Sequence, residues 1–399
     1  AIPFMLSPSP NMGVVESLFE AFSGLSTTGA TVLTGIDQLP RSILYYRQQL
    51  QWLGGMGIVV LAVAIMPMLG VGGMQLYRTE MPGPLKDNKL SPRIADTAKT
   101  LWLIYCALTL LCALAYWAAG MNLFDAIGHS FSTIAIGGFS THDASIGYFD
   151  SALIELICMF FMAISGMNFA LHFLALRSRS LTAYLKDPEC QTYLKILAAA
   201  FLITATVLMI YSHHDDPLLS IRYAAFEVVS VATTTGFGIT DFSGWPSLLP
   251  FLLLYTTFIG ACAGSTGGGM KVMRVMLLYR QGQREIQRLL HPNGVFTIKL
   301  GKRRVPDRVI ESVWGFFVVY MVTFFTLMLA LLACELDPIT AFSALASCMN
   351  NLGPALGDAT AHYGNLPAAA QLILSLAMIL GRLEIFSLLI LLSPAFWRY

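Results

Sequence analysis

Charged residues are scarce in this sequence. Asp, Glu, Lys and Arg together make up 12% of the 399 residues, whereas apolar residues make up 56%. An ordinary soluble domain carries about 25% charged residues, so a soluble chain of this length would lack the polar surface it needs. The composition therefore excludes an ordinary soluble protein and favours one that faces lipid.

Paired cysteines and clustered metal ligands are also missing. The seven cysteines lie within or beside apolar stretches, without a CxxC pair or a histidine at ligand spacing, and are expected to be small buried hydrophobic residues. The run 213–216 (His-His-Asp-Asp) is expected to be a solvated turn, because adjacent side chains seldom converge on one ion. Convergent nucleophiles and bases are absent from the apolar stretches, so an enzyme is not expected. A nucleic-acid partner is not expected either. The chain begins with Ala1 and shows no cleavable signal peptide.

Long apolar stretches are what the sequence does have. A helix needs about 20 apolar residues to cross the hydrocarbon core of a bilayer. Seven stretches approach or exceed this length: Trp52–Leu69, Leu101–Ala119, Ala152–Leu176, Leu194–Tyr211, Leu248–Gly264, Val309–Ala333 and Ala368–Leu392. They predict an all-α polytopic membrane protein.

The basic residues orient these spans. Of the 24 Lys and Arg residues, 19 fall in the connecting segments 78–99, 177–195 and 271–308, whereas the other connections collect aspartates. Basic loops stay on the cytoplasmic side, so the acidic loops are expected to face outward and to attract cations.

Four shorter apolar stretches alternate with the long ones, and each ends at a glycine. They are Val14–Thr28, Leu123–Ile136, Leu218–Thr235 and Pro338–Leu352, followed or closed by Gly29, Gly137, Gly236 and Gly353 at separations of 108, 99 and 117 residues. Most are too short to span, so they are expected to enter the membrane and turn back. This periodicity predicts four repeats, 1–77, 78–180, 181–290 and 291–399. The first repeat lacks an outer spanning helix, so an N-terminal portion of the working protein is expected to be missing.

Such a unit suits an ion pathway. A dehydrated K⁺ recovers its hydration from backbone carbonyls, and glycine reaches the backbone angles that turn carbonyls toward one axis. The C-terminal ends of the short helices carry partial negative charge that favours a cation.

At the four glycine turns, at Gly260–Lys271 and at Gly381–Arg382 the sequence resembles the Trk/Ktr/HKT superfamily of cation transporters. The resemblance covers nearly the whole chain and implies four repeats around one central pore. It implies a K⁺ selectivity filter formed by Thr28, Gly29, Ile136, Gly137, Thr235, Gly236, Leu352 and Gly353, with a further layer from Thr27, Ala135, Thr234, Asn351 and Gly138. K⁺ is then the transported ion and the only metal expected. Pro354 departs from the filter of true potassium channels, so modest selectivity over Na⁺ is expected.

The resemblance also implies a location and partners. The location is the bacterial inner membrane, with the filter mouth facing the periplasm and the basic loops in the cytoplasm. The membrane subunit is expected to be a homodimer in the lipid bilayer, regulated by a cytoplasmic nucleotide-binding ring similar to TrkA. The basic segment 274–308 has the length and charge to receive such a ring.

One apolar span is interrupted by glycine. Residues Gly264, Ser265, Thr266, Gly267, Gly268 and Gly269 form a stretch too polar and glycine-rich for a regular helix, and we interpret 260–271 as an intramembrane gate loop. The alternative is helix packing through small residues; a phosphate-binding loop is disfavoured because Met270 occupies the position of its lysine. Arg382 lies within the last span and is expected to contact this loop and slow cation passage. The alternative is an arginine merely bonded to loop carbonyls.

Two transport mechanisms remain open from the sequence. One is a gated, passive K⁺ pathway; the other is an H⁺- or Na⁺-coupled symporter, which usually requires a titratable group inside the membrane. The candidates Glu16, Glu20, Glu155 and Glu227 all lie near outer helix ends, which favours the passive pathway. Arg222 is expected to pair with an outer acid such as Asp241.

Overall fold

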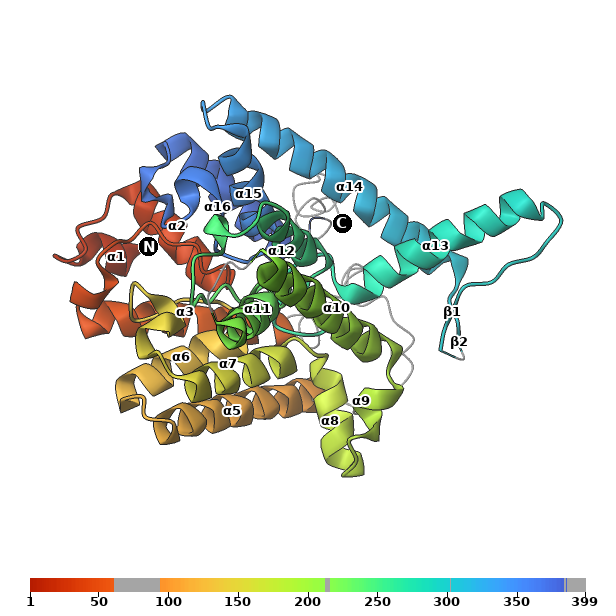
Figure 1. The fold of residues 1–399 in the computed structure, drawn as a ribbon, viewed down its shortest axis with the longest axis horizontal. Coiled ribbons are helices and arrows are strands. Elements are labelled where there is room, and N and C mark those ends of the chain that lie inside the picture. The colour runs from red at the N-terminus through yellow and green to blue at the C-terminus, as the bar shows by residue number, and fades with distance from the viewer. Residues whose placement is uncertain (61–93, 212–215, 302, 384, 386–399) are drawn as a thin grey trace.

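The computed structural model describes residues 1–60, 94–211, 216–301, 303–383 and 385. Helices dominate the described chain (Figure 1). The α-helices are α1 (Ile2–Leu6), α2 (Val14–Leu25), α3 (Arg41–Val60), α5 (Ile94–Ala118), α6 (Leu123–Ala135), α7 (Ala152–Ser165), α8 (Phe169–Ser178), α9 (Thr182–Lys186), α10 (Pro188–Ile210), α11 (Pro217–Ala232), α12 (Leu248–Ile259), α13 (Val272–Leu290), α14 (Asp307–Leu332), α15 (Pro338–Met349) and α16 (Ala368–Arg382). Short 3₁₀ turns occur at Ile36–Gln38, Ser145–Phe149, Phe242–Gly244, Gly357–Ala359 and Tyr363–Asn365, and β1 (Lys299–Leu300) pairs antiparallel with β2 (Arg303–Arg304).

The four short helices predicted from the sequence are α2, α6, α11 and α15. Their starts are set by local chemistry. Asn122 caps α6, accepting a hydrogen bond from the Asp125 amide at 2.9 Å, and Asp337 caps α15 by accepting from two amides. Pro217 and Pro338 occupy first-turn positions where the missing N–H has no consequence. Capping and proline together explain why these helices begin where they do.

The long spans agree only in part with the prediction. Among the described residues, α10, α14 and the part of α5 from Ala98 to Ala118 are long and apolar enough to cross a membrane. The stretch Ala152–Leu176 is instead two helices, α7 and α8, bent by 95°. The break is the place where another segment docks: the Cys262 amide donates to the Gly166 carbonyl at 2.9 Å, and the Phe169 amide donates to the Gly264 carbonyl at 3.0 Å.

Three other predicted spans end early or leave the described residues. α12 stops at Ile259, because Gly260 adopts a positive φ and residues 260–271 are not helical. The predicted spans Trp52–Leu69 and Ala368–Leu392 are helical over their described parts, α3 and α16, and their remainders lie outside the described residues.

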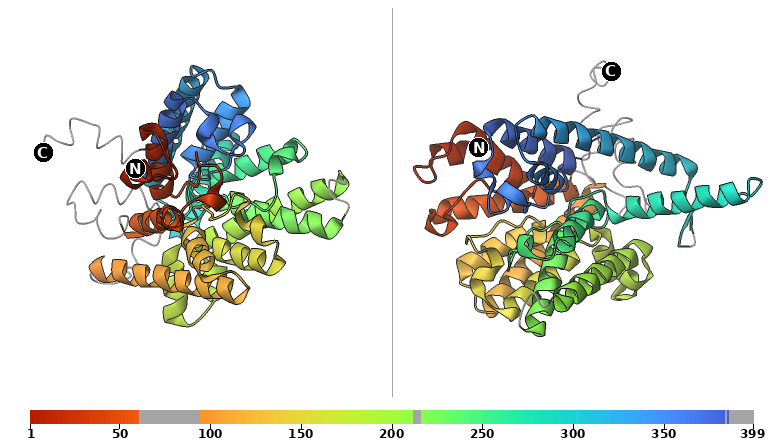
Figure 2. Two further views of the ribbon diagram at one scale, coloured as in Figure 1. Left: turned by 90° about the vertical axis from the view of Figure 1, so that its left-hand side faces the viewer. Right: turned by 45° about the horizontal axis from the view of Figure 1, so that its top comes forward.

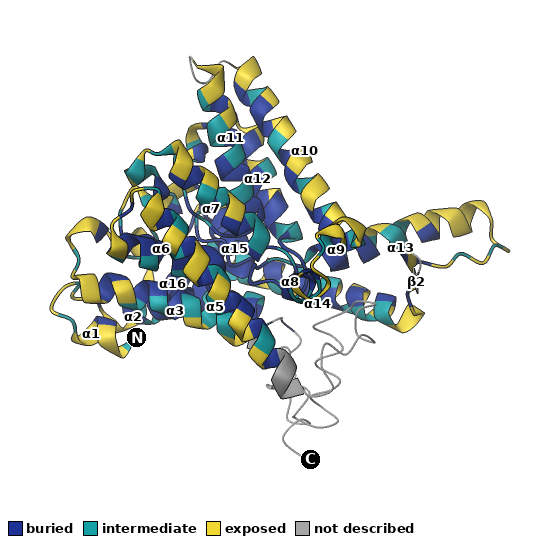
Figure 3. Ribbon diagram, turned by 90° about the horizontal axis from the view of Figure 1, so that it is seen from below, coloured by how far each residue is buried: buried dark blue, intermediate teal, exposed yellow. Residues whose placement is uncertain are grey.

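The outer surface of the helices is apolar. Leu110, Leu111 and Trp117 of α5 are 55–61% exposed, and Figure 3 shows exposed residues along the outward sides of α5, α10 and α11. Water would penalise large apolar side chains in such numbers, whereas lipid does not. The exposed apolar surface therefore matches a membrane environment.

The helices close into a circle. α2 packs against α16, α3 against α6, α7 against α11, and α12 against α15, so the first and last parts of the chain lie side by side (Figures 1 and 2). α13 and the β1–β2 hairpin extend away from this body, which Figure 1 shows at the right-hand side. The circular packing brings four loops, each following a short helix, to the middle.

Candidate functional site

All four short helices end in the same backbone motif. In this Schellman ending, a residue in the left-handed conformation closes the helix and the next amide bonds to a carbonyl five residues earlier. The left-handed residues are Thr27, Ile136, Thr234 and Asn351, with φ of 55–66°. The following amides belong to Thr28, Gly137, Thr235 and Leu352, and they donate to the carbonyls of Ser23, Ser132, Ser230 and Ser347 at 2.8–2.9 Å. The four loops thus leave their helices in one shared geometry.

This motif sets the correspondence between the loops and corrects one alignment. Two residues past each left-handed residue stands a glycine with φ of 76–103°: Gly29, Gly138, Gly236 or Gly353. In the second loop that glycine is Gly138, so the predicted match of Gly137 to Gly29 was offset by one residue. Ala135 is the last residue of α6, and Ile136 matches Thr27. The serine six residues before each of these glycines is a sequence signal that would have given the correct register.

The four glycines pack against one another's loops in a closed ring. A Cβ atom built on each glycine would lie too close to a carbonyl oxygen of the next loop. The distances are 2.1 Å from Gly29 to the Gly137 oxygen, 2.2 Å from Gly138 to the Thr235 oxygen, 2.0 Å from Gly236 to the Leu352 oxygen and 2.7 Å from Gly353 to the Thr28 oxygen. Each glycine therefore approaches the carbonyl preceding the corresponding glycine in the next loop. No side chain larger than hydrogen fits these contacts without moving backbone.

The ring concentrates strained and unpaired groups. Thr27, Ile136 and Thr234 are β-branched residues in the left-handed region, which costs of order 1–3 kcal/mol each and is typical of functional sites. Several buried oxygen atoms next to the ring have no hydrogen-bond partner among the described residues: the hydroxyls of Ser23, Thr27, Ser132 and Ser347, and the side-chain oxygen of Asn351. Buried oxygens of this kind call for water or a cation.

A buried ion pair braces the first two loops. Arg47 of α3 and Glu20 of α2 are 1% and 0% exposed, and their Nε and Oε1 atoms lie 2.7 Å apart. Arg47 also donates to the Ser140 carbonyl at 3.2 Å, and Glu20 accepts from the Thr31 hydroxyl at 3.0–3.1 Å. The pair joins the chain just past Gly29 to the chain just past Gly138.

A glutamine of α3 supports the same loops. The Gln51 Nε2 donates to the Gly137 carbonyl at 2.5 Å, and its Oε1 accepts from the Phe139 amide at 3.1 Å. The sequence prediction did not include Gln51 or Arg47, because only the folded chain shows which face of α3 meets the ring.

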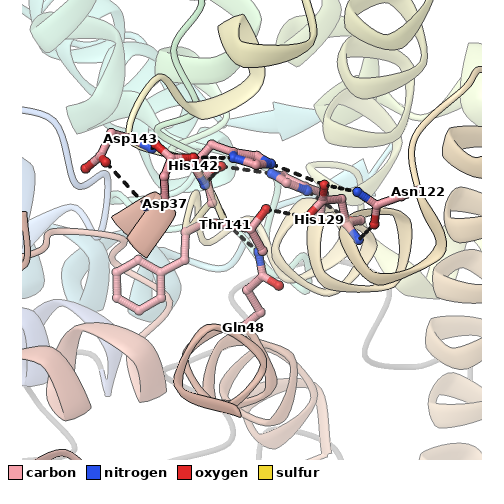
Figure 4. Close-up of polar contacts among 10 residues, drawn as sticks. Asp37, Gln48, Asn122, His129, Thr141, His142 and Asp143 are labelled. Atoms are coloured by element: carbon pink, nitrogen blue, oxygen red, sulfur yellow. Dashed lines mark hydrogen bonds and ion pairs between the residues drawn. The ribbon is translucent and has the colours of Figure 1, made fainter. Parts of the chain in front are cut away.

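An outer polar network lies beyond this brace (Figure 4). The His142 ring bonds Asp37 through Nδ1 at 2.5 Å and Asp125 through Nε2 at 3.2 Å. Desolvation alone would raise the pKa of Asp37, but hydrogen bonds from His142 and the Asp143 amide hold it below its ordinary value. The network ties the outer segments of the first and second loops together and leaves acidic groups on the outer side.

The loop 260–271 lies directly against the helix ends that feed the ring. The Thr266 hydroxyl donates to the Ile134 carbonyl of α6 at 2.9 Å, and the Gly268 amide donates to the Thr234 hydroxyl at 2.7 Å. A Cβ on Gly268 would lie 1.9 Å from the Asn350 carbonyl oxygen. The loop therefore contacts the ends of α6, α11 and α15.

Arg382 contacts this loop, which both the gate hypothesis and its alternative expected. Its Nη1 donates to the Thr266 carbonyl at 2.8 Å, and the side chain is 8% exposed. Its Nε and Nη2 atoms have no hydrogen-bond partner within the described part of the chain. The guanidinium thus brings a positive charge to the loop.

The other acidic side chains considered in the sequence form local ion pairs and hydrogen bonds. Arg222 pairs with Glu155 at 2.5 Å and, more weakly, with Asp150 at 3.5 Å. The sequence predicted an outer acid such as Asp241; the partners are these two acids instead, because the circular packing sets α11 against α7. Glu227 accepts from the Ile239 and Thr240 amides of its own loop. Of the predicted turn 213–216, Asp216 caps α11, and the other three residues lie outside the described residues. No cluster of three metal-ligating side chains occurs in the described chain.

Apolar membrane helices arranged around a ring of loop backbone are the architecture of a polytopic transport protein. Comparison with known proteins agrees. The family model described as TrkH, cation transport protein, matches residues 1–399. The chain belongs to this TrkH family of cation transport proteins.

Individual relatives are similar over the whole chain. It is 60% identical to the Trk system potassium uptake protein TrkH of Halomonas elongata and 56% identical to that of Escherichia coli K12, in each case over 100% of this chain and 82% of the relative. The crystal structure of the potassium transporter TrkH from Vibrio parahaemolyticus superimposes with a TM-score of 0.90 at 52% identity, covering 99% of this chain and 82% of that one.

Proposed function

We propose that this chain is the membrane subunit of a K⁺ uptake system of the bacterial inner membrane, and that the ring of four loops is its selectivity filter. The observation that carries the proposal is the closed glycine–carbonyl contact around the four loops. Such a ring offers carbonyl oxygens from four directions without a net charge that would trap the ion. The named relatives are potassium uptake proteins.

The filter residues follow the corrected register. One carbonyl layer comes from Thr28, Gly137, Thr235 and Leu352, the next from Gly29, Gly138, Gly236 and Gly353, and an inner layer from Thr27, Ile136, Thr234 and Asn351. The C-terminal ends of α2, α6, α11 and α15 lead into these layers, so four helix dipoles favour the cation. The repeats 1–77, 78–180, 181–290 and 291–399 are part of the same proposal.

Loop 260–271 is the gate in this proposal, and Arg382 holds it in place. Support comes from the loop's contacts with three of the four helix ends and from the bond between Arg382 and Thr266. A positive charge at this position opposes cation passage. Opening then requires the loop to leave the helix ends.

Regulation by a cytoplasmic nucleotide-binding ring and assembly as a homodimer complete the proposal. The support is the placement of α13, which follows the gate directly and carries basic residues away from the helical body (Figure 2). A partner bound there has a direct mechanical path to the loop.

The ion pairs and hydrogen bonds of the four candidate glutamates favour passive conduction over coupled symport. Glu20 and Glu155 are held in ion pairs, Glu16 accepts from the Gly13 amide, and Glu227 from two loop amides. A coupling group has to change partners during transport. Glu16 and Glu155 lie in the first turns of α2 and α7, and Glu20 and Glu227 lie farther along α2 and α11, where each is held by these local bonds.

The test is K⁺ flux into liposomes containing the intact protein, with and without an imposed pH or Na⁺ gradient. Passive conduction predicts that K⁺ moves down its own gradient at the same rate in all conditions. Accumulation of K⁺ that occurs only with the H⁺ or Na⁺ gradient would establish symport instead.

A further inference from the structure

Glu189 is a buried acid that the filter and the Arg382 contact do not use. It lies in the first turn of α10 and is 2% exposed. Its Oε1 atom accepts two backbone hydrogen bonds, from the Ala263 amide at 2.7 Å and from the Met273 amide at 3.2 Å. A buried carboxylate is retained only where such bonds compensate its desolvation.

The two donors lie on opposite sides of the gate loop. Ala263 belongs to the beginning of loop 260–271, and Met273 lies in the first turn of α13, where amides have no partner within the helix. One carboxyl oxygen of Glu189 therefore accepts hydrogen bonds from both sides of the loop.

The two hydrogen bonds of Glu189 lie where a movement of α13 would be transmitted to the loop. α13 extends from the helical body past the β1–β2 hairpin, which lies beside it (Figure 1), whereas α10 lies within the body and packs against α11, α12 and α13. A displacement of α13 relative to α10 must lengthen the bond between Glu189 and the Met273 amide. It also pulls on the loop, because the Lys271 side chain donates to the Gly267 carbonyl.

We propose that Glu189 is a positioning residue that fastens loop 260–271 closed and releases it when α13 is displaced. The inference rests on the proposed gating function of the loop. It adds the specific joint through which α13 and the loop are coupled.

Cys262 offers a readout that is independent of transport. This thiol lies in the loop next to Ala263 and is 0% exposed. In the intact protein with the six other cysteines replaced, we would measure its modification rate by a small thiol reagent, together with K⁺ flux into liposomes. The variants are Glu189→Ala, which removes the acceptor, and Glu189→Gln, which keeps an uncharged one. Asp187→Ala is the matched control. It removes the cap of α10, bonded to the Cys190 amide at 2.8 Å, and a carboxyl group that, like Glu189, acts electrostatically on Cys262, but it removes no hydrogen bond to the loop.

We expect Glu189→Ala to speed Cys262 modification at least tenfold and to raise K⁺ flux. The modification rate of Glu189→Gln should lie between those of Glu189→Ala and the wild type. Asp187→Ala should change the modification rate less than threefold. Unchanged modification in Glu189→Ala overturns the inference, as does equal acceleration by Asp187→Ala or a Glu189→Gln variant as fast as Glu189→Ala. Faster modification without higher flux would support the role of Glu189 in fastening the loop and would refute the proposal that the loop is the gate.

Discussion

Replacing Gly138 by alanine tests the corrected register of the second loop. Two terms oppose the substitution. The residue has φ +76°, and the left-handed conformation costs about 1–2 kcal/mol for a residue with a Cβ. The new Cβ would also lie 2.2 Å from the Thr235 carbonyl oxygen, so the two backbones must separate by about 0.8 Å to reach even 3.0 Å.

Gly35 provides the matched control. It has φ +65° and no atom within 4 Å of a built Cβ, so Gly35→Ala carries only the conformational cost. We expect Gly138→Ala to reduce K⁺ flux at least tenfold, equivalent to about 1.4 kcal/mol, because it displaces carbonyls of the third loop. Gly35→Ala should conduct as the wild type does.

The assay is K⁺ flux into liposomes per incorporated protein, with thermal unfolding measured alongside. Transport lost only in Gly138→Ala, with both variants still folded at the assay temperature, would identify the ring contact as the cause. A Gly138→Ala variant that conducts like Gly35→Ala would refute the assignment of Gly138 to the ring.

Three further predictions concern groups around the ring. Arg382→Ala removes the bond to the Thr266 carbonyl and should raise K⁺ flux severalfold; unchanged flux at normal expression would contradict the gate. Arg47→Ala leaves the buried Glu20 carboxylate without its ion-pair partner and should lower the free energy of unfolding by about 3–5 kcal/mol. A decrease of less than about 1 kcal/mol, measured by denaturant unfolding, would count against the brace. Hydrogen bonds from the Thr340 side chain and amide lower the pKa of Asp337, so its stabilisation is present above the ordinary aspartate pKa of about 3.9 and is lost as the pH falls through the lower folded value. Asp337→Ala should therefore cost about 1 kcal/mol at pH 7 and progressively less in acid, and a loss independent of pH would refute this.

The short helices and their glycine turns could be predicted from the sequence because both signals are local. Apolar length and the following glycine predict α15 from its own residues. The register of the second loop could not be settled in that way, since Gly137 and Gly138 are adjacent and either satisfies a glycine pattern. The backbone motif decides, through the amide bonded to the Ser132 carbonyl.

Features that depend on packing were missed for a physical reason. The bend between α7 and α8 arises where loop 260–271 bonds to Gly166 and Phe169, residues about 100 positions away. Composition alone makes the same stretch a single apolar span. The pairing of Arg47 with Glu20 likewise depends on how α3 meets α2, which hydrophobic periodicity does not specify.

The central claim is that the ring of four loops selects K⁺, and Gly236→Ser tests it most directly. A Cβ at this position would lie 2.0 Å from the Leu352 carbonyl oxygen, so the substitution must disturb the contact between the third and fourth loops. The measurement is the ratio of K⁺ to Na⁺ flux into liposomes for the wild type and the variant. The account predicts a wild type that prefers K⁺ and a variant in which that ratio falls. A ratio unchanged by Gly236→Ser, in protein that still conducts, would show that the ring is not the selectivity filter.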